Sequence, residues 1–309
     1  MTSTQPGLNW IGLHIDNRVI AELARESSLY WVYVGQDLTA ESSDLIKVAK
    51  QSIDDRFTAD QFSELALVER EHRWQALDLA PARVLVRQAA KALSREDPRL
   101  LRLRAVVLDA GLPYVRMEKP QGTNWTVLDR PDRKTVISLL QVLKDLESTF
   151  GRNWHGNLRP DSLWVSESGI RIEDSTGWFD TLNAEAVAVT TPAYYPYLRN
   201  DDCLAVGIIL YEALMRLHPF TDSALDPRYY SCYSFSDDLL RAADDFTGIY
   251  GKWFAQFQPG RRNEVRISRE FESVLLRAIG LELDAQGRLS LSSPYASFDE
   301  MLEVFTEHM

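Results

Sequence analysis

The clearest hydrophobic pattern lies in the second half of the chain and predicts a hairpin followed by a buried helix. Two short apolar runs, at residues 163–165 and 170–172, have the length of strands and are separated by a turn-forming Glu-Ser-Gly at 167–169. Residues 203–215 are apolar almost all round, a run too long for a typical strand and too short to span a bilayer. We expect this segment to be a helix that is buried on most faces.

A second helix is predicted over residues 132–150, because its large apolar residues recur at helical spacing. These residues are Val136, Leu139, Leu140, Leu143 and Leu146. We interpret this segment as a core helix.

The first half of the chain predicts mainly strands. Residues 18–24 and 30–34 are rich in β-forming residues and are joined by a polar turn at 25–28, and residues 45–48 form a further short run. Residues 100–108 and 112–117 alternate well enough for an antiparallel pair with a turn at 109–111. Between these strands, residues 59–95 have a helical composition.

Composition excludes several classes of protein. The 309 residues are 45% hydrophobic and 26% charged, as in an ordinary globular chain, and a net charge of −11 without a basic run argues against nucleic-acid binding. Two cysteines argue against a disulfide framework, and they show no metal-ligand spacing with the five histidines. The first residues lack the pattern of a signal peptide, and no segment reaches membrane length. We expect a cytoplasmic protein that binds neither nucleic acid nor membrane.

Four short motifs follow one another in the region with the clearest pattern. They are His-Gly-Asn-Leu-Arg-Pro-Asp-Ser at 155–162, Asp174, Thr-Pro-Ala-Tyr at 191–194 and Asp-Cys-Leu-Ala-Val-Gly at 202–207. In this order they resemble the catalytic loop, the metal-binding aspartate, the end of the activation segment and the start of the central helix of eukaryotic-type (Hanks-type) Ser/Thr protein kinases. Residues 271–279 and 298–305 similarly resemble the last helices of that family.

This resemblance covers roughly residues 17–307 and implies the fold class and the domain boundaries. It implies an α+β, bilobal protein-kinase-like fold, with a small antiparallel β N-lobe that carries a helix and a larger, mainly α-helical C-lobe. We expect an N-terminal lead-in at 1–16, the N-lobe at 17–119 and the C-lobe at 120–309. The C-lobe is expected to be elaborated at about 221–268, a segment longer than in the core family.

The catalytic positions depart from the family. In active kinases the loop aspartate accepts the proton of the substrate hydroxyl, and a later asparagine helps to hold the second Mg²⁺. Asn157 and Ser162 stand at these positions, and a neutral amide has no basic site near pH 7. Gly156 replaces the loop arginine that often pairs with a phosphate on the activation segment. The resemblance therefore implies a site with no working catalytic residue.

Three residues could still contribute to nucleotide binding. Lys47 matches the family lysine that contacts the α- and β-phosphates, Asp174 matches the metal-binding aspartate, and Glu118 falls in the hinge between the lobes. The hinge position from which the family donates an N–H to adenine is Pro120, which has none. We expect no cofactor, and residual binding of ATP or Mg²⁺ through Lys47, Asp174 and Glu118 is the alternative.

Two further family features are absent or unassigned. The glycines of the turn that covers the phosphates are replaced by Ala24, Glu26 and Leu29. The helix glutamate that pairs with the family lysine falls near Arg87 or Gln88, neither of which is acidic. Other acidic residues available for this role are Glu69 and Glu71.

A cluster of aromatic residues in the elaborated segment is the candidate partner surface. Aromatic residues at such density are typical of a core and also of a protein interface. The candidates are Tyr229, Tyr230, Tyr233, Phe235 and Trp253.

These observations favour a catalytically inactive kinase-like domain, a pseudokinase, that acts as a regulatory or scaffolding protein-binding module. The alternative is a weakly active or atypical ATP-dependent transferase that uses Lys47 and Asp174. A third reading is a small-molecule sensor whose cleft between the lobes is adapted to another ligand.

Overall fold

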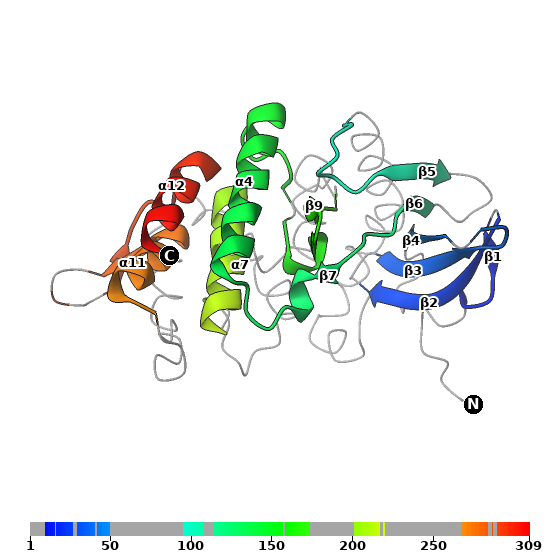
Figure 1. Ribbon diagram of the computed structural model, residues 1–309, viewed down its shortest axis with the longest axis horizontal. Helices are drawn as coiled ribbons and strands as arrows, with labels where there is room; N and C mark the ends of the chain where they lie inside the picture. Colours follow the sequence, from blue (N-terminus) through cyan, green and yellow to red (C-terminus); the bar gives the residue numbers. More distant parts are fainter. Residues whose placement is uncertain are drawn as a thin grey trace, which may run out of the picture. The chain divides into compact units, whose positions relative to one another are not determined.

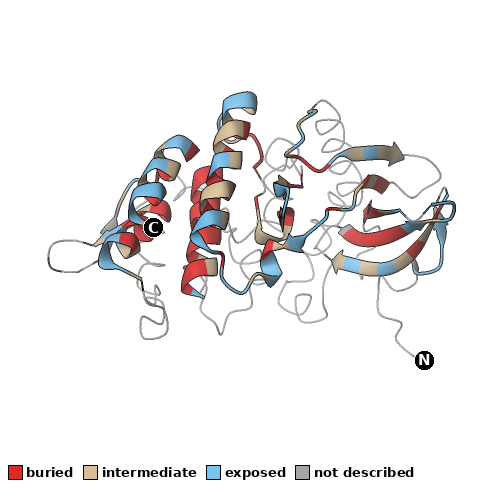
Figure 2. Cartoon of the chain, viewed as in Figure 1, coloured by how far each residue is buried: buried red, intermediate tan, exposed pale blue. Residues whose placement is uncertain are grey.

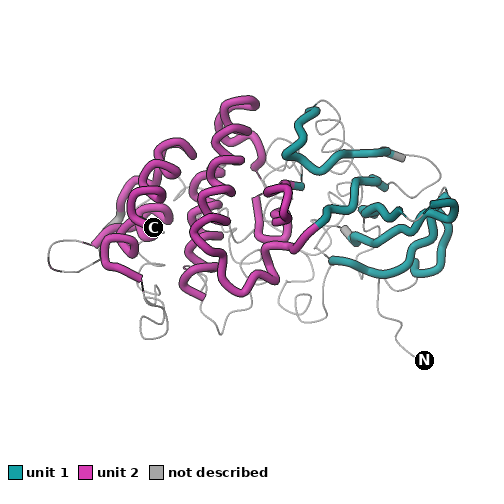
Figure 3. The backbone as a smooth tube through the Cα atoms, in the orientation of Figure 1, with its two compact units in different colours: residues 1–121, 173–190 teal, residues 122–172, 191–309 magenta. Residues whose placement is uncertain are grey.

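The computed structural model describes residues 10–15, 17–26, 30–40, 42–49, 95–107, 114–156, 158–173, 201–216, 219, 267–283, 286 and 289–309. The chain forms two compact units (Figure 3). Unit 1 comprises Met1–Gln121 and Glu173–Thr190, and unit 2 comprises Gly122–Ile172 and Thr191–Met309. Within the described ranges, none of the helices combines the length and the apolar character needed to cross a membrane.

Unit 1 is built on one antiparallel sheet with the strand order β1-β2-β3-β4-β6-β5 (Figure 1). Its strands are β1 (His14–Ile15), β2 (Arg18–Glu26), β3 (Tyr30–Asp37), β4 (Ser43–Ala49), β5 (Leu103–Val107) and β6 (Tyr114–Glu118). Strand β1 lies in the stretch that the sequence marks as a lead-in, and it pairs with β2.

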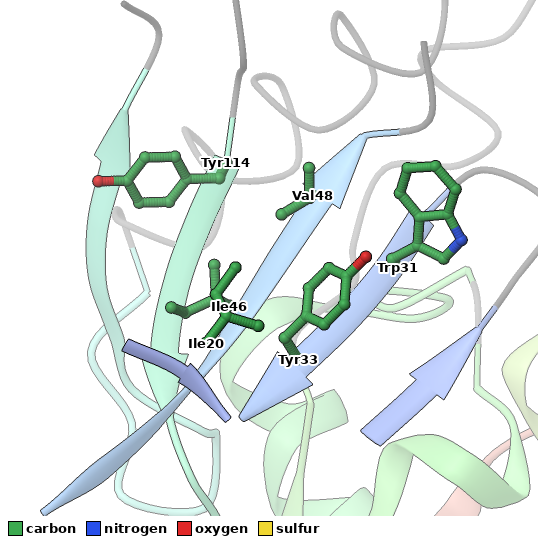
Figure 4. Packing of buried hydrophobic residues seen from close by; sticks show 6 residues of the cluster. All are labelled: Ile20, Trp31, Tyr33, Ile46, Val48 and Tyr114. Atoms are coloured by element: carbon green, nitrogen blue, oxygen red, sulfur yellow. The ribbon is translucent and has the colours of Figure 1, made fainter. Parts of the chain in front are cut away.

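Both faces of this sheet are buried. One face carries a hydrophobic cluster of residues that lie opposite one another across β2, β3, β4 and β6 (Figure 4). The cluster consists of Ile20, Trp31, Tyr33, Ile46, Val48 and Tyr114. The alternate residues Val32, Val34, Leu45 and Val115 are also buried, and side chains alternate between the two faces of a strand. Lys47 therefore projects from the face opposite the cluster.

Unit 2 is mainly helical. The helices among its described residues are α4 (Arg133–Phe150), α7 (Asp202–Met215), α11 (Arg269–Ala278) and α12 (Phe298–His308), with short 3₁₀ helices η2 (Trp125–Val127) and η3 (Pro160–Ser162). The described part of unit 2 also contains two small antiparallel sheets. One consists of β7 (Thr123–Asn124), β8 (Leu163–Ser166) and β9 (Gly169–Ile172), and the other of β10 (Leu281–Leu283) and β11 (Leu289–Leu291).

Helix α7 is the centre of unit 2. Twelve of its fourteen residues are buried (Figure 2), as predicted from a run that is apolar almost all round. Helix α11 packs against α7, and α12 packs against α4. The contact with α11 requires Gly207, because a Cβ atom at this position would lie 2.1 Å from the backbone oxygen of Ala278.

The predicted elements of unit 2 are confirmed, and those of unit 1 differ at their ends. The hairpin appears as β8 and β9, and the predicted core helix appears as α4, capped by Asp132. Strand β2 continues through Arg25 and Glu26, which we expected in a turn. Glu118, expected in a hinge, is the last residue of strand β6. The predicted helix at 59–95 falls almost wholly outside the described residues.

Candidate functional site

The loop that resembles a catalytic loop is fastened to the first turn of α7 by one carboxylate. Asp202 is fully buried and accepts hydrogen bonds from two consecutive backbone N–H groups, from His155 to Oδ2 and from Gly156 to Oδ1, both at 2.9 Å. The backbone N–H of Asp202 in turn donates to Oδ1 of Asn153 at 3.2 Å. Gly156 has a φ of 67°, a left-handed conformation that glycine adopts without the strain of a Cβ. The frame of the loop is therefore set by Asp202 and Gly156.

The side chain of Ser162 holds one turn of this loop together by hydrogen bonds to the backbone. Its side chain is buried, and its Oγ donates to the backbone oxygen of Arg159 at 2.7 Å and accepts from the backbone N–H of Arg159 at 3.1 Å. Both hydrogen bonds close the single turn of η3. A neutral hydroxyl committed in this way to the backbone is a poor ligand for Mg²⁺, which prefers carboxylates and phosphate oxygens.

The end of the loop is also held from β7. The side-chain amide of Asn124 donates to the backbone oxygens of Asp161 at 3.0 Å and Leu163 at 3.2 Å. The amide oxygen of the same residue accepts from the backbone N–H of Thr126 and so caps η2. Asn124 therefore joins η2 to the loop.

Beside the loop, unit 2 contains a pocket of about 420 Å³ between η2, the loop and α7. Its wall includes three carboxylates, from Asp129, Asp161 and Glu212, and two guanidinium groups, from Arg159 and Arg216. Arg159 pairs with Asp161 at 3.2 Å, and Arg216 pairs with Asp129. Two of the three carboxylates in the wall are thus paired with an arginine of the same wall.

In unit 1, Lys47 lies on β4 and pairs with a carboxylate that we did not predict. Its Nζ lies 3.4 Å from Oε1 of Glu173, and both side chains are buried, with exposures of 7% and 1%. Arg25 donates from Nη2 to the other oxygen of the same carboxylate, Oε2, at 2.7 Å. Glu173 directly follows β9 in sequence and belongs to unit 1 by its contacts. We name Arg25, Lys47 and Glu173 the ion triad.

A β-bulge places Arg25 in this triad. Leu23 pairs with Tyr33, whereas Arg25 pairs with Val32, so the register shifts by one residue between them. Residues opposite each other across strands share a face, so Leu23 shares the face of Tyr33 and Arg25 shares the opposite face. Val32 in turn pairs with Lys47 on β4. Arg25, Val32 and Lys47 therefore form one row across three strands.

Of the predicted site residues, Lys47, Glu118, Gly156 and Ser162 are described. The Oε2 atom of Glu118 accepts from the backbone N–H of Arg102 at 3.4 Å, and the backbone N–H of Glu118 donates to the oxygen of Arg102 at 2.9 Å. These contacts extend the pairing of β6 with β5 to Arg102, the residue before β5. Within the described ranges, no group of three or more His, Cys, Asp or Glu is arranged to hold a metal ion.

The other predicted site residues lie outside the described residues. They are Asn157, Asp174, Tyr229, Tyr230, Tyr233, Phe235 and Trp253, together with the candidate helix acids Glu69 and Glu71. What is inferred about these positions rests on the amino acid found at each of them.

Arg25 and Glu173 are the two residues of the ion triad that the sequence did not reveal. Arg25 was assigned to a polar turn, and the bulge that re-aims it depends on the pairing with β3. Glu173 stands next to Asp174, and the resemblance directed attention to the latter. The sequence offered one signal for Glu173. It directly follows a short strand, and Asp174, a second acidic residue, comes next.

Comparison with known proteins identifies the fold. No protein-family model matches the sequence, and no curated protein matches it. Among solved structures, the apo form of PpkA-294 is similar with a TM-score of 0.57 and 16% identity, over 95% of this chain and 98% of that chain. Rad53 1–466 in complex with AMP-PNP has a TM-score of 0.52 and 16% identity, over 93% of this chain and 64% of that chain. The PknI kinase domain of Mycobacterium tuberculosis has a TM-score of 0.49 and 15% identity, over 97% and 99%.

At this level of identity the first two similarities establish the fold. The chain has an α+β architecture with a sheet-based first unit and a mainly helical second unit, and this is the fold of Ser/Thr protein kinase domains. The protein-kinase-like fold predicted from the sequence is confirmed.

Proposed function

We propose that this chain is a pseudokinase, a kinase fold that transfers no phosphoryl group and serves as a regulatory or scaffolding module that binds another protein. The observation that carries the proposal is the commitment of the Ser162 hydroxyl to the backbone of Arg159. At the position of the second metal ligand, the chain uses its side chain to hold the loop together.

The residue at the position of the catalytic base supports the same conclusion. Asn157 is an amide and cannot accept a proton near neutral pH. General acid–base catalysis contributes about 10²–10⁴ in rate, and loss of an electrostatic contact to the reacting group costs about 10²–10³. The two losses together remove most of the rate enhancement that a kinase site supplies.

The binding role has two candidate surfaces. One is the pocket beside the loop, where Glu212 supplies a third carboxylate in a wall with two arginines. Such a wall of charged groups suits a charged side chain of a protein partner, held by charge-assisted hydrogen bonds. The other candidate is the aromatic segment that includes Tyr229, Tyr233 and Trp253. In both cases the ligand is a protein, with no nucleic acid or membrane involved.

The test is a transfer assay with ATP labelled at either the γ- or the α-phosphate. We expect the wild-type protein to transfer neither label to itself or to a mixed peptide acceptor. The double substitution Asn157→Asp and Ser162→Asn restores the family residues, and a gain of γ-label transfer by this variant would show that the rest of the site is competent.

Transfer of the γ-label by the wild type, lost in Lys47→Ala, would contradict the proposal. Transfer of the α-label would identify instead an atypical transferase that uses Lys47 and Asp174. A parallel measurement is thermal unfolding with ATP and Mg²⁺, where ligand at about 100 times its Kd adds about 2.7 kcal/mol to the free energy of unfolding. We expect no such stabilisation of the wild type.

A further inference from the structure

The ion triad brings two cations from one sheet face to a single carboxylate. Arg25 and Lys47 lie two strands apart in the same row, separated by Val32 on β3. Neighbouring strands are about 4.8 Å apart, so the two backbones are separated by about 10 Å. The Glu173 carboxylate fills this span, with Oε2 at 2.7 Å from Arg25 and Oε1 at 3.4 Å from Lys47.

An anion is required at this position for the triad to be stable. Lys47 and Glu173 are almost fully buried, and Arg25 has a side-chain exposure of 19%. A charge removed from water is stabilised inside a protein only when it is paired and hydrogen-bonded. Glu173, the residue that follows β9, supplies a negative group that contacts both cations.

The chemistry of the two cations indicates which external ligand could replace that carboxylate. A guanidinium group presents parallel N–H donors that match phosphate oxygens, and an ammonium group binds phosphate as a point charge. A carboxylate offers two oxygens and one negative charge. A phosphate chain offers more oxygens, more charge and enough length to bridge two strands.

We propose that Arg25 and Lys47 form a phosphate-binding clamp that Glu173 occupies as an internal substitute for the ligand. The Glu173 carboxylate competes with any phosphate-bearing molecule, so the clamp binds one only when this carboxylate is displaced. The bulge in β2 is the device that builds the clamp, because it turns Arg25 onto the face of Lys47.

The clamp rests on one part of the proposed function, namely that the wild-type protein does not bind ATP at Lys47. The clamp gives a physical reason why the wild-type protein does not bind ATP, and it names Arg25 and Glu173 as the residues responsible. Loss of the base at Asn157 stops transfer without affecting phosphate binding, so the two proposals concern different steps.

The test is Glu173→Gln, which preserves shape and removes the competing charge. Binding of inorganic tripolyphosphate is measured without metal by calorimetry and by thermal unfolding. We expect Glu173→Gln to bind at least about tenfold more tightly than the wild type, because like charges placed side by side oppose binding strongly. Glu22→Gln is the matched control, since it removes one exposed carboxylate from the same strand as Arg25 and should leave binding at the wild-type level.

Two double variants identify the clamp as the binding site. Combining Glu173→Gln with Arg25→Gln or with Lys47→Gln should abolish the gained binding. Glu173→Asp keeps the charge and shortens the side chain, so it protects the fold if the glutamine variant is unstable, and it should bind with intermediate affinity. The proposal is overturned if neither variant of Glu173 binds tripolyphosphate more tightly than the wild type, or if the double variants bind equally well.

Comparison of probes distinguishes the possible sources of phosphate. Metal-free ATP that binds Glu173→Gln with the same dependence on Arg25 and Lys47 supports a nucleotide ligand, and tripolyphosphate alone supports an inorganic polyphosphate. Binding of adenosine without binding of either phosphate compound would overturn the clamp. Phosphoryl transfer by the wild type would refute the proposed function, whereas failed phosphate binding by the variants refutes only the clamp.

Discussion

Removal of the Asp202 carboxylate should release the loop from α7 and lower the stability of unit 2. Asp202→Ala deprives two buried backbone N–H groups, those of His155 and Gly156, of their acceptor. An unsatisfied buried donor costs about 1–3 kcal/mol, so the two together should lower the free energy of unfolding by about 2–6 kcal/mol. Asp202→Asn keeps the volume but offers one acceptor oxygen, and its NH₂ group faces a donor, so it should also be destabilising.

The neighbouring residue provides a matched control. Asp201 is similarly buried, but its side chain makes a single cap hydrogen bond, from the N–H of Leu204 at 3.1 Å. Replacing a capping aspartate by alanine costs about 0.5–2 kcal/mol. Asp201→Ala should therefore be clearly less destabilising than Asp202→Ala.

Urea unfolding measures the stability difference, and amide hydrogen exchange locates it. In Asp202→Ala the amides of His155 and Gly156 should exchange much faster, because their hydrogen bonds to the carboxylate are gone. In Asp201→Ala exchange at these two amides should remain near the wild-type rate. Equal unfolding energies for the two variants, or unchanged exchange in the loop, would refute the role of Asp202.

Two further substitutions test packing and burial in unit 2. Gly207→Ala places a Cβ atom 2.1 Å from the backbone oxygen of Ala278, and such overpacking should lower the free energy of unfolding by about 1–3 kcal/mol or more, visible as a lower melting temperature; an unchanged melting temperature would contradict the close contact. Burial raises the pKa of Tyr295 to about 12, against the opposing effect of Arg277. A raised pKa keeps the phenol neutral in the folded state, so stability is retained below pH 10 and lost by up to about 2–3 kcal/mol as the pH rises to 12. Urea unfolding from pH 9 to 12 should show a smaller loss of stability in Tyr295→Phe than in the wild type.

The helices of unit 2 were predictable because their signals are local. The apolar run of α7 and the regular spacing in α4 each lie within one segment, and burial of these faces determines the helix. The same holds for the β8–β9 hairpin, whose turn lies between its strands. The resemblance of the motifs to those of protein kinases then predicted the fold. These motifs lie in the part of the chain with the clearest local pattern.

The contacts of the candidate site were not predictable, because they depend on which strands and loops meet. The face of Arg25 is decided by a register shift against β3, which no pattern within β2 reveals. The pairing of Lys47 with Glu173 joins residues 126 positions apart. Ser162 appeared in the sequence as a lost metal ligand, whereas its hydrogen bonds to Arg159 make it part of the loop frame.

The loop keeps its frame through groups other than the residues that carry catalysis in active kinases. The frame of the loop depends on Asp202, on the conformation of Gly156 and on Asn124, and none of these groups takes part in proton or phosphoryl transfer in the family. The substitution at Ser162 adds a tie to the frame. Restoration of an asparagine at this position therefore removes two hydrogen bonds from η3 while it restores a metal ligand. The residue at position 162 thus affects both the shape of the loop and its capacity to hold a metal ion. Serine at this position favours the shape of the loop.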